Sequence, residues 1–265
     1  MIASIRSEWL KMRTTAVPWV LTGIALLIDA LLILVYFLNH GDTGGNNNSN
    51  VVNSFGSPNY PHSTQQLRNL LGAGFEGYLF ALLLGVLILT TEFRHKTVTT
   101  TFLVLPQRPR FVGAKLISAA IFGAGLAVIV LVATLIGGGI TLAADGGSFS
   151  SLAGQIPDVA PGMILVFALF AILGVGVGSV LTNQVAAIIV TLGWFIILEG
   201  ILVSLVHGAA RWVPTGAATA ASNLTRGQGA SFGLFNQWQG TLLMLGYGLV
   251  FAVIGSVILT RRDIT

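Results

Sequence analysis

The sequence predicts an all-α integral membrane protein with six transmembrane helices. Of its 265 residues, 54% are hydrophobic and only 8% are charged, whereas soluble domains carry roughly 25% charged residues. So few charges cannot cover a surface that faces water, and lipid must therefore be the main solvent of this chain. Long apolar runs are the second observation, because about 20 apolar residues in a helix cross the roughly 30 Å hydrocarbon core of a bilayer. We expect residues 1–265 to form a single membrane domain.

The apolar runs set the boundaries of the six expected spans. These cover approximately residues 17–38, 68–91, 112–143, 161–181, 185–206 and 240–260. The asparagine-rich segment 39–66 and the segment 144–160 separate spans as loops. Residues 207–239 contain Trp212, Pro214 and Trp238 and are too interrupted for a full crossing. We expect short re-entrant helices there, dipping into the outer leaflet where protein or water covers the backbone.

Lysine and arginine positions predict the orientation. Six spans place both termini on one side, and that side holds Arg6, Lys11, Arg13, Arg94, Lys96, Arg108, Arg110, Lys115, Arg261 and Arg262. Only Arg68, Arg211 and Arg226 fall on the opposite side. Because positive residues concentrate in cytoplasmic loops, we expect both termini and the connection 91–115 in the cytoplasm, in a multi-pass protein of the plasma membrane.

The first residues form a short amphipathic pattern ahead of the first span. Helical spacing joins the apolar residues Ile2, Ile5, Trp9 and Met12, while Lys11 and Arg13 take other positions. Such a helix lies in the headgroup layer, anchored by Trp9 and with its basic residues toward the cytosol. The alternative is a plain juxtamembrane tail with positive residues.

The common catalytic and nucleotide-binding motifs are missing from the sequence. It has no G-x-x-x-x-G-K-[ST], no H-E-x-x-H, no G-x-S-x-G and no cysteine. We therefore predict no catalytic residue and no metal site. No basic patch interleaved with aromatic residues indicates binding of nucleic acid. If the protein does work, the energy must come from a partner or from an ion gradient.

Segment 91–115 has the features of a docking site for a cytoplasmic partner. Val98, Phe102 and Leu105 share one helical face, and Pro106 ends the helix. Threonines such as Thr97 favour a short helix. Glu92 can cap or pair near the start, and Arg94, Lys96, Arg108 and Arg110 supply positive charge. The alternative is a solvated, positively charged loop.

The order of residues in this segment resembles a known family. Glu92, Lys96, Thr97, Pro106, Arg108, Arg110 and Lys115 are similar in type and order to the first cytoplasmic connection of ABC transporter permeases. The resemblance is to the type-2 exporter class, in its bacterial, actinobacterial-like form. Residues 7–15 resemble the interfacial elbow helix of that family, and Arg262-Asp263 resembles its usual ending. One departure is Lys96, where the family often has glycine.

The resemblance implies a mechanism and partners. It implies a permease that works as a dimer, with a second copy or a homologous permease, and with two copies of a separate ABC ATP-binding subunit. ATP and Mg²⁺ would bind to that partner, so no cofactor is expected in this chain. Closure of the partner would press on a coupling helix between the second and third spans. The segment 207–239 would match the family's re-entrant outer helices.

Acidic residues within the spans are the remaining candidates. Counting from the cytoplasmic ends at about 1.5 Å per residue puts Asp29, Glu76 and Glu199 near one level of the bilayer. Acids at such depth are unfavourable and usually face a bundle interior, a partner or a water-filled cavity. They either line a pathway for a cationic substrate or serve the structure, for example by pairing with Arg68 or Arg211. Asp29 is the deepest and the strongest pathway candidate, whereas a structural role is favoured for Glu76 and Glu199.

Other functions remain open at this point. A gradient-driven secondary transporter would use the three acids as proton or cation sites, but no internal repeat supports it. A membrane-embedded enzyme lacks a recognisable nucleophile or metal cluster. A sensory or immunity protein built on the same permease fold is the last alternative.

Overall fold

The computed structural model describes residues 2–39, 64–95, 108–144, 146–181, 183–206, 208–224 and 234–261. Within these ranges the chain forms helices and no strand. Six of the described helical segments are long and apolar enough to cross a membrane, which confirms the predicted fold class. They are Ala16–Val35, Ala73–Arg94, Gly113–Ala144, Ile156–Val180, Gln184–Leu205 and Gln237–Ile258.

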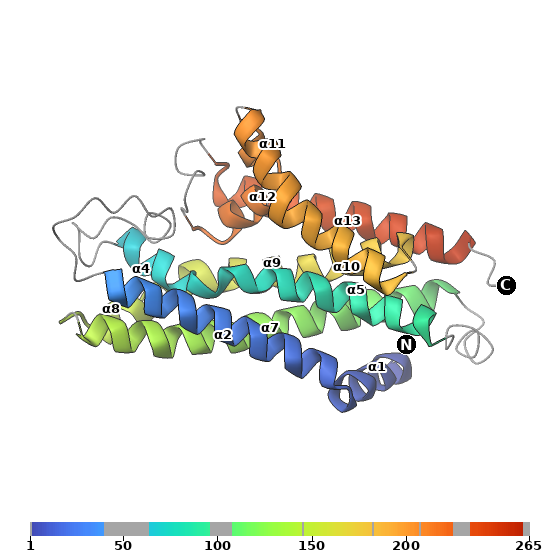
Figure 1. Ribbon diagram of the computed structural model, residues 1–265, viewed down its shortest axis with the longest axis horizontal. Coiled ribbons are helices and arrows are strands. Elements are labelled where there is room, and N and C mark those ends of the chain that lie inside the picture. The colour runs from blue at the N-terminus through green and yellow to red at the C-terminus, as the bar shows by residue number, and fades with distance from the viewer. Residues whose placement is uncertain are drawn as a thin grey trace.

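The helices follow one another as a long bundle (Figure 1). Their bounds are α1 (Ile2–Thr14), α2 (Ala16–Asn39), α4 (Thr64–Leu71), η1 (Ala73–Gly77), α5 (Tyr78–Arg94), α7 (Arg108–Ala144), α8 (Phe149–Ala153), α9 (Ile156–Val180), α10 (Gln184–Leu192), η2 (Gly193–Leu198), α11 (Glu199–Leu205), η3 (Ala209–Arg211), α12 (Pro214–Ala221) and α13 (Gln237–Arg261). Helices α10, η2 and α11 together make the fifth span, and η2 is a stretch of π-helix.

The centre of the bundle is the contact between α5 and α9, where glycines let the two backbones approach. A Cβ atom on Gly85 would lie 2.0 Å from the carbonyl oxygen of Ala171, and one on Gly174 would lie 2.0 Å from that of Leu82. No other residue fits at either position. Small residues at such contacts are typical of membrane helices, which gain little from the hydrophobic effect and rely on close packing.

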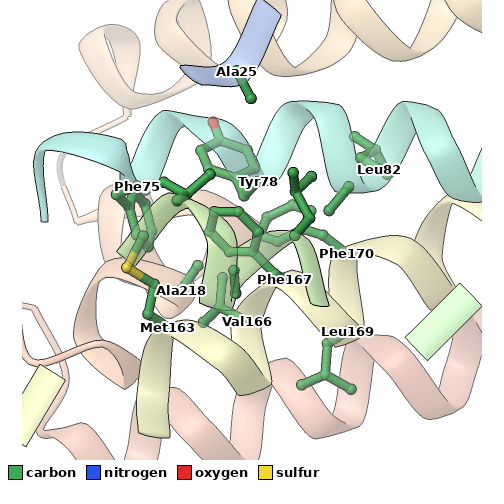
Figure 2. Close-up of a cluster of buried hydrophobic side chains, with 14 of the residues drawn as sticks. Ala25, Phe75, Tyr78, Leu82, Met163, Val166, Phe167, Leu169, Phe170 and Ala218 are labelled. Atoms are coloured by element: carbon green, nitrogen blue, oxygen red, sulfur yellow. The ribbon is translucent and has the colours of Figure 1, made fainter. Parts of the chain in front are cut away.

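Aromatic side chains fill the core beside this contact. Figure 2 shows Phe75, Tyr78, Phe167 and Phe170 gathered between the helices. The rings of Tyr78 and Phe170 are tilted, with centroids 4.5 Å apart, which is a favoured geometry for an aromatic pair. The core therefore lies among α5, α7 and α9.

The other three spans surround this core and expose apolar faces. Only 17% of the spanning window is buried in each of α2, the fifth span and α13, against 72% for the span that contains α5. The fifth span leans outward, since α10 packs against α5 while α11 projects from the bundle (Figure 1). These faces can only contact lipid or another protein chain.

The second span begins later than the sequence predicted. Residues from about 68 were expected in the span, but α4 ends at Leu71 and the crossing starts at Ala73. Arg68 explains the difference, because its guanidinium forms an ion pair with Asp158 and donates to Gln155 Oε1 at 3.1 Å. Both partners lie near the start of α9, so a polar clamp holds α4 beside the bundle end.

Short helices occupy the described part of segment 207–239, as predicted. Helix α12 buries Ala217, Ala218 and Ala221 and packs against α13 and α9. Gly240 permits this contact, since a Cβ there would lie 2.6 Å from that of Ala220. That these helices dip into a leaflet stays a prediction.

Both ends of the described chain lie at the same end of the bundle (Figure 1). The end of α5 and the beginning of α7 lie there too (Figure 1). Helices α4 and α8 lie at the opposite end (Figure 1). This arrangement agrees with the even number of spans.

Candidate coupling site

Glu92 joins three helices at the end of the bundle that holds both termini. It lies in the last turn of α5, and its Oε1 accepts from Lys115 Nζ of α7 at 2.6 Å and from Lys11 Nζ of α1 at 3.0 Å. We call these three residues the Glu92 cluster. One carboxylate thus joins the helix before the first span to the second and third spans.

The two lysines of the Glu92 cluster differ in their exposure. Lys115 is only 1% exposed, whereas the side chain of Lys11 is about half exposed, at 50%. A buried ammonium loses its hydration and is tolerated only when an opposite charge compensates it. Glu92, itself 6% exposed, supplies that charge, so the pair with Lys115 is the structural part of the cluster.

Helix α1 packs against the bundle next to this cluster. The Trp9 ring stacks on Phe122 of α7, with centroids 5.1 Å apart and an angle of 20° between the ring planes. The helix predicted over residues 2–13 is therefore present. Its place in the headgroup layer stays a prediction, and the side chain of Ile5 lies outside what the structure describes.

The fifth span begins at the same end. Arg94, exposed at the end of α5, donates to Gln184 Oε1 of α10 at 3.3 Å. Asn183 caps α10, since its side-chain oxygen accepts from the backbone N–H of Val185 and Ala186 at 3.0 and 3.2 Å. Such a cap satisfies N–H groups that the first turn of a helix leaves without partners. Movement of the α5 end would therefore reach α10 as well.

Most of the predicted docking segment lies outside the described residues. This applies to Lys96, Thr97, Val98, Phe102, Leu105 and Pro106. Arg108 and Arg110 open α7, but their side chains are also outside the description. The coupling helix stays a prediction, and the structure instead describes the two helix ends that this segment joins.

Asp29 lies inside the bundle, against α7 and η1. It is 2% exposed, and the Thr134 hydroxyl lies 3.0 Å from each carboxylate oxygen. Gly74 makes room for it, because a Cβ at that position would lie 3.1 Å from Asp29 Oδ1. Asp29 also lines a cavity of about 350 Å³ between α2 and α7.

Glu199 has a different environment from Asp29. Its Oε1 accepts from the Thr215 hydroxyl and, at 2.9 Å, from the Thr215 backbone N–H, at the start of α12. Glu199 is 4% exposed, and its Oε2 has no hydrogen-bond partner among the described residues. A carboxylate at a helix N-terminus is stabilised by the backbone N–H groups there. Glu199 therefore ties the fifth span to α12, and its structural role stays a prediction.

Glu76 is exposed on η1, the short helix that packs against α2. The alternative that the acids pair with Arg68 or Arg211 gains no support. Arg68 binds Asp158, and the Arg211 guanidinium lies over the rings of Trp212 and Phe235, 5.9 and 5.8 Å from their centroids. Asp29 is thus bonded to α7, whereas Glu199 is bonded to α12.

Comparison with known families decides the identity of the fold. The model of a family described as ABC-2 family transporter protein matches residues 4–198, more than half of the chain. The chain belongs to the ABC-2 transporter family. It is therefore a permease-type, multi-pass membrane protein, and its family implies an ATP-binding partner subunit. No match was found among curated proteins.

The ABC-2 match includes most of α1, the Glu92 cluster and Asp29, and it ends one residue before Glu199. Sequence reasoning named Glu92 and Lys115 but expected Glu92 to pair locally. It did not foresee the contacts of Glu92 with Lys11 and Lys115. The available signal was that a lysine at the start of an apolar span, where burial is expected, requires an acid nearby.

We expect Lys115→Met to lower the thermal stability of the purified chain in detergent. Removing one partner of a buried ion pair costs about 3–5 kcal/mol. Lys11→Met is expected to have a small effect, because half-exposed pairs contribute only about 0.2–1 kcal/mol. Combining Glu92→Gln with Lys115→Met should recover part of the loss, since neither buried charge of the pair then remains and Lys11 is half exposed. A Lys115→Met protein with the unfolding temperature of the wild type would contradict this account.

Proposed function

We propose that this ABC-2 protein is the permease subunit of an ATP-driven exporter. It forms the translocation path as a dimer, with a second copy or a homologous permease. Two copies of a separate ATP-binding subunit bind ATP and Mg²⁺ and hydrolyse the nucleotide, so this chain takes no catalytic part. The observation that carries the proposal is the Glu92 cluster, at the point where segment 96–107 leaves and re-enters the bundle.

The cluster explains how a force on segment 96–107 would reach the membrane. The segment is bonded covalently to the end of α5 and to the start of α7. The buried Glu92–Lys115 pair locks these two helix ends together, so neither can move without the other. Lys11 extends the lock to α1, and Arg94 extends it to α10. A partner that presses on the segment would therefore move α1, α5, α7 and α10 as one unit.

The charge distribution supports a cytoplasmic partner at this end. The end of the bundle with both termini carries most of the lysines and arginines, and positive residues favour the cytoplasmic side. We infer that the Glu92 cluster faces the cytosol, where ATP is available. The helices η3 and α12 would then lie toward the outer side and close the exit of the path.

Asp29 is the best candidate for a contact with the transported molecule. It lines the cavity between α2 and α7, and α2 is one of the peripheral spans that a second permease copy can approach. A buried carboxylate in that cavity favours a substrate with a cationic or amine group, because burial strengthens the attraction between opposite charges. Glu76 on the neighbouring η1 would add negative charge nearby.

Phe102→Asp tests the coupling role. A carboxylate on the predicted apolar face should disrupt docking of the ATP-binding subunit. In proteoliposomes that contain the full complex, we expect hydrolysis to continue while transport per ATP falls at least about tenfold, as loss of roughly 1.4 kcal/mol of coupling would give.

Phe102→Leu is the matched control and should keep transport, because it preserves the apolar face. Normal transport by a stably assembled Phe102→Asp complex would count against the coupling helix. Transport by the permease alone, driven by an ion gradient without ATP, would refute the proposed function as a whole.

Asp29→Asn tests the pathway role. The amide keeps the size of the side chain and can accept from Thr134, but it removes the negative charge. We expect weaker transport of cationic substrates and unchanged transport of neutral ones, measured as competition between substrates in vesicles. A variant with an unaltered substrate range would assign Asp29 to the structure instead.

A further inference from the structure

A groove on the side of the bundle combines a cationic side chain with apolar ones, and the proposed transport function assigns it no role. It lies between α1, α2 and α7 and has a volume of about 300 Å³. Trp9 and Arg13 of α1, Trp19 and Thr22 of α2, and Ile121 and Ile129 of α7 line it. Trp19, Ile121 and Ile129 are 62%, 45% and 43% exposed, so the groove opens outward, where the lipid of a membrane would be.

The groove has a cation at one end. Arg13 is exposed in the last turn of α1, and within the described chain its guanidinium has no ion pair or hydrogen bond. Its neighbour Lys11 differs, because Lys11 is held by Glu92. The Trp19 indole N–H donates to the Arg13 carbonyl oxygen at 3.3 Å, which fixes the joint between α1 and α2. Arg13 therefore lies at the rim of the groove, and no group of the described chain neutralises its charge.

The rest of the groove is an apolar channel that runs along α7. From Ile121 to Ile129 the helix rises about 12 Å at 1.5 Å per residue. Gly125 forms the floor, and a Cβ atom on it would meet nothing within 4 Å. Unlike Gly85 and Gly174, this glycine does not serve a close helix contact. Its missing side chain leaves a hollow that an alkyl chain can fill.

We propose that this groove is a binding site for one anionic phospholipid of the leaflet in which α1 lies. Arg13 binds the phosphate through charge-assisted hydrogen bonds, and an acyl chain lies over Gly125 between Ile121 and Ile129. Thr22 also lines the groove and adds a hydroxyl group to it. Trp9 and Trp19 fit this position, since tryptophan concentrates at the level of the headgroups.

A lipid is the one occupant that matches both ends of the groove. A soluble phosphate would satisfy Arg13 and leave the channel in contact with lipid chains. A zwitterionic lipid would fill the channel but bring a second cation beside Arg13. The bound lipid would brace α1 against α2 and α7, close to the Glu92 cluster. Assigning the lipid to the cytoplasmic leaflet rests on the proposed orientation, whereas the binding itself does not depend on the ATP-binding partner.

The headgroup is tested on the purified full chain without its partner. Phosphatidylglycerol and phosphatidylcholine with the same acyl chains are titrated, and bound lipid is counted by native mass spectrometry. We expect phosphatidylglycerol to bind preferentially and Arg13→Gln to weaken it roughly tenfold, as loss of one hydrogen bond to a charged group gives. Arg94→Gln removes a charge at the same end of the bundle and should keep the preference. An equal loss in both variants would mean general attraction by net charge and would overturn the site.

The acyl channel is tested by Gly125→Leu, which adds a side chain at a position where a Cβ atom meets nothing within 4 Å. We expect it to abolish the tightest lipid-binding event. Gly246→Leu on α13 is the matched control, because a Cβ there also meets nothing within 4 Å, and it should bind lipid as the wild type does. Glycerol 3-phosphate should not compete, since it lacks the chain.

Besides an equal loss in Arg13→Gln and Arg94→Gln, three results would overturn the proposal. They are equal affinity of the wild type for the two lipids, unchanged binding by Gly125→Leu, and full competition by glycerol 3-phosphate. Should Gly125→Leu fail to fold, Arg13→Gln, at an exposed position, still decides the question. Because no ATPase is present, failure here leaves the proposed transport function untouched, and failure of ATP coupling leaves the lipid site untouched.

Discussion

The buried ion pair between Glu92 and Lys115 is the constraint on which the architecture of the bundle end with both termini depends. Two charges withdrawn from water are tolerated only when they remain together, so the ends of α5 and α7 must stay in register. Lys11 brings α1 to the same carboxylate, and α1 in turn places Trp9 on Phe122 and Arg13 at the rim of the lateral groove. Loss of the pair would therefore loosen the packing of α1 together with that of the ends of α5 and α7.

The remainder of the bundle consists of a tightly packed core and of peripheral spans. Glycine contacts between α5 and α9 leave no room for adjustment, and aromatic rings fill the space beside them (Figure 2). The peripheral spans bury far less of their surface. The fifth span contains a π-helical stretch, and Glu199 at the start of α11 joins it to α12. The core is therefore the tightly packed part of the bundle, whereas most residues of the peripheral spans are not buried within the chain.

The six spans could be predicted from the sequence, but the contacts between residues far apart in the chain could not. Long apolar runs have one stable solution in a bilayer, which is why the six spans and the helix over residues 2–13 were predicted. The ion pair of Arg68 with Asp158 could not be predicted, because the two residues are far apart in sequence. The same reason hid the partners of Glu92. Depth in the bilayer distinguished Asp29 from Glu199 in the sequence, but it did not predict their hydrogen-bond partners, Thr134 and Thr215.

Accessibility of the bundle end near Glu92 is the most direct test of the account. The chain has no cysteine, so His95→Cys, at an exposed position just after α5, introduces one label site, and Phe149→Cys does so at the opposite end. With a membrane-impermeant maleimide, we expect His95→Cys to react only in inside-out vesicles and to be protected when the ATP-binding subunit is bound. Phe149→Cys should react only in whole cells. Labelling of His95→Cys from outside the cell, or labelling that the bound subunit does not change, would contradict the assignment of this end as the coupling site.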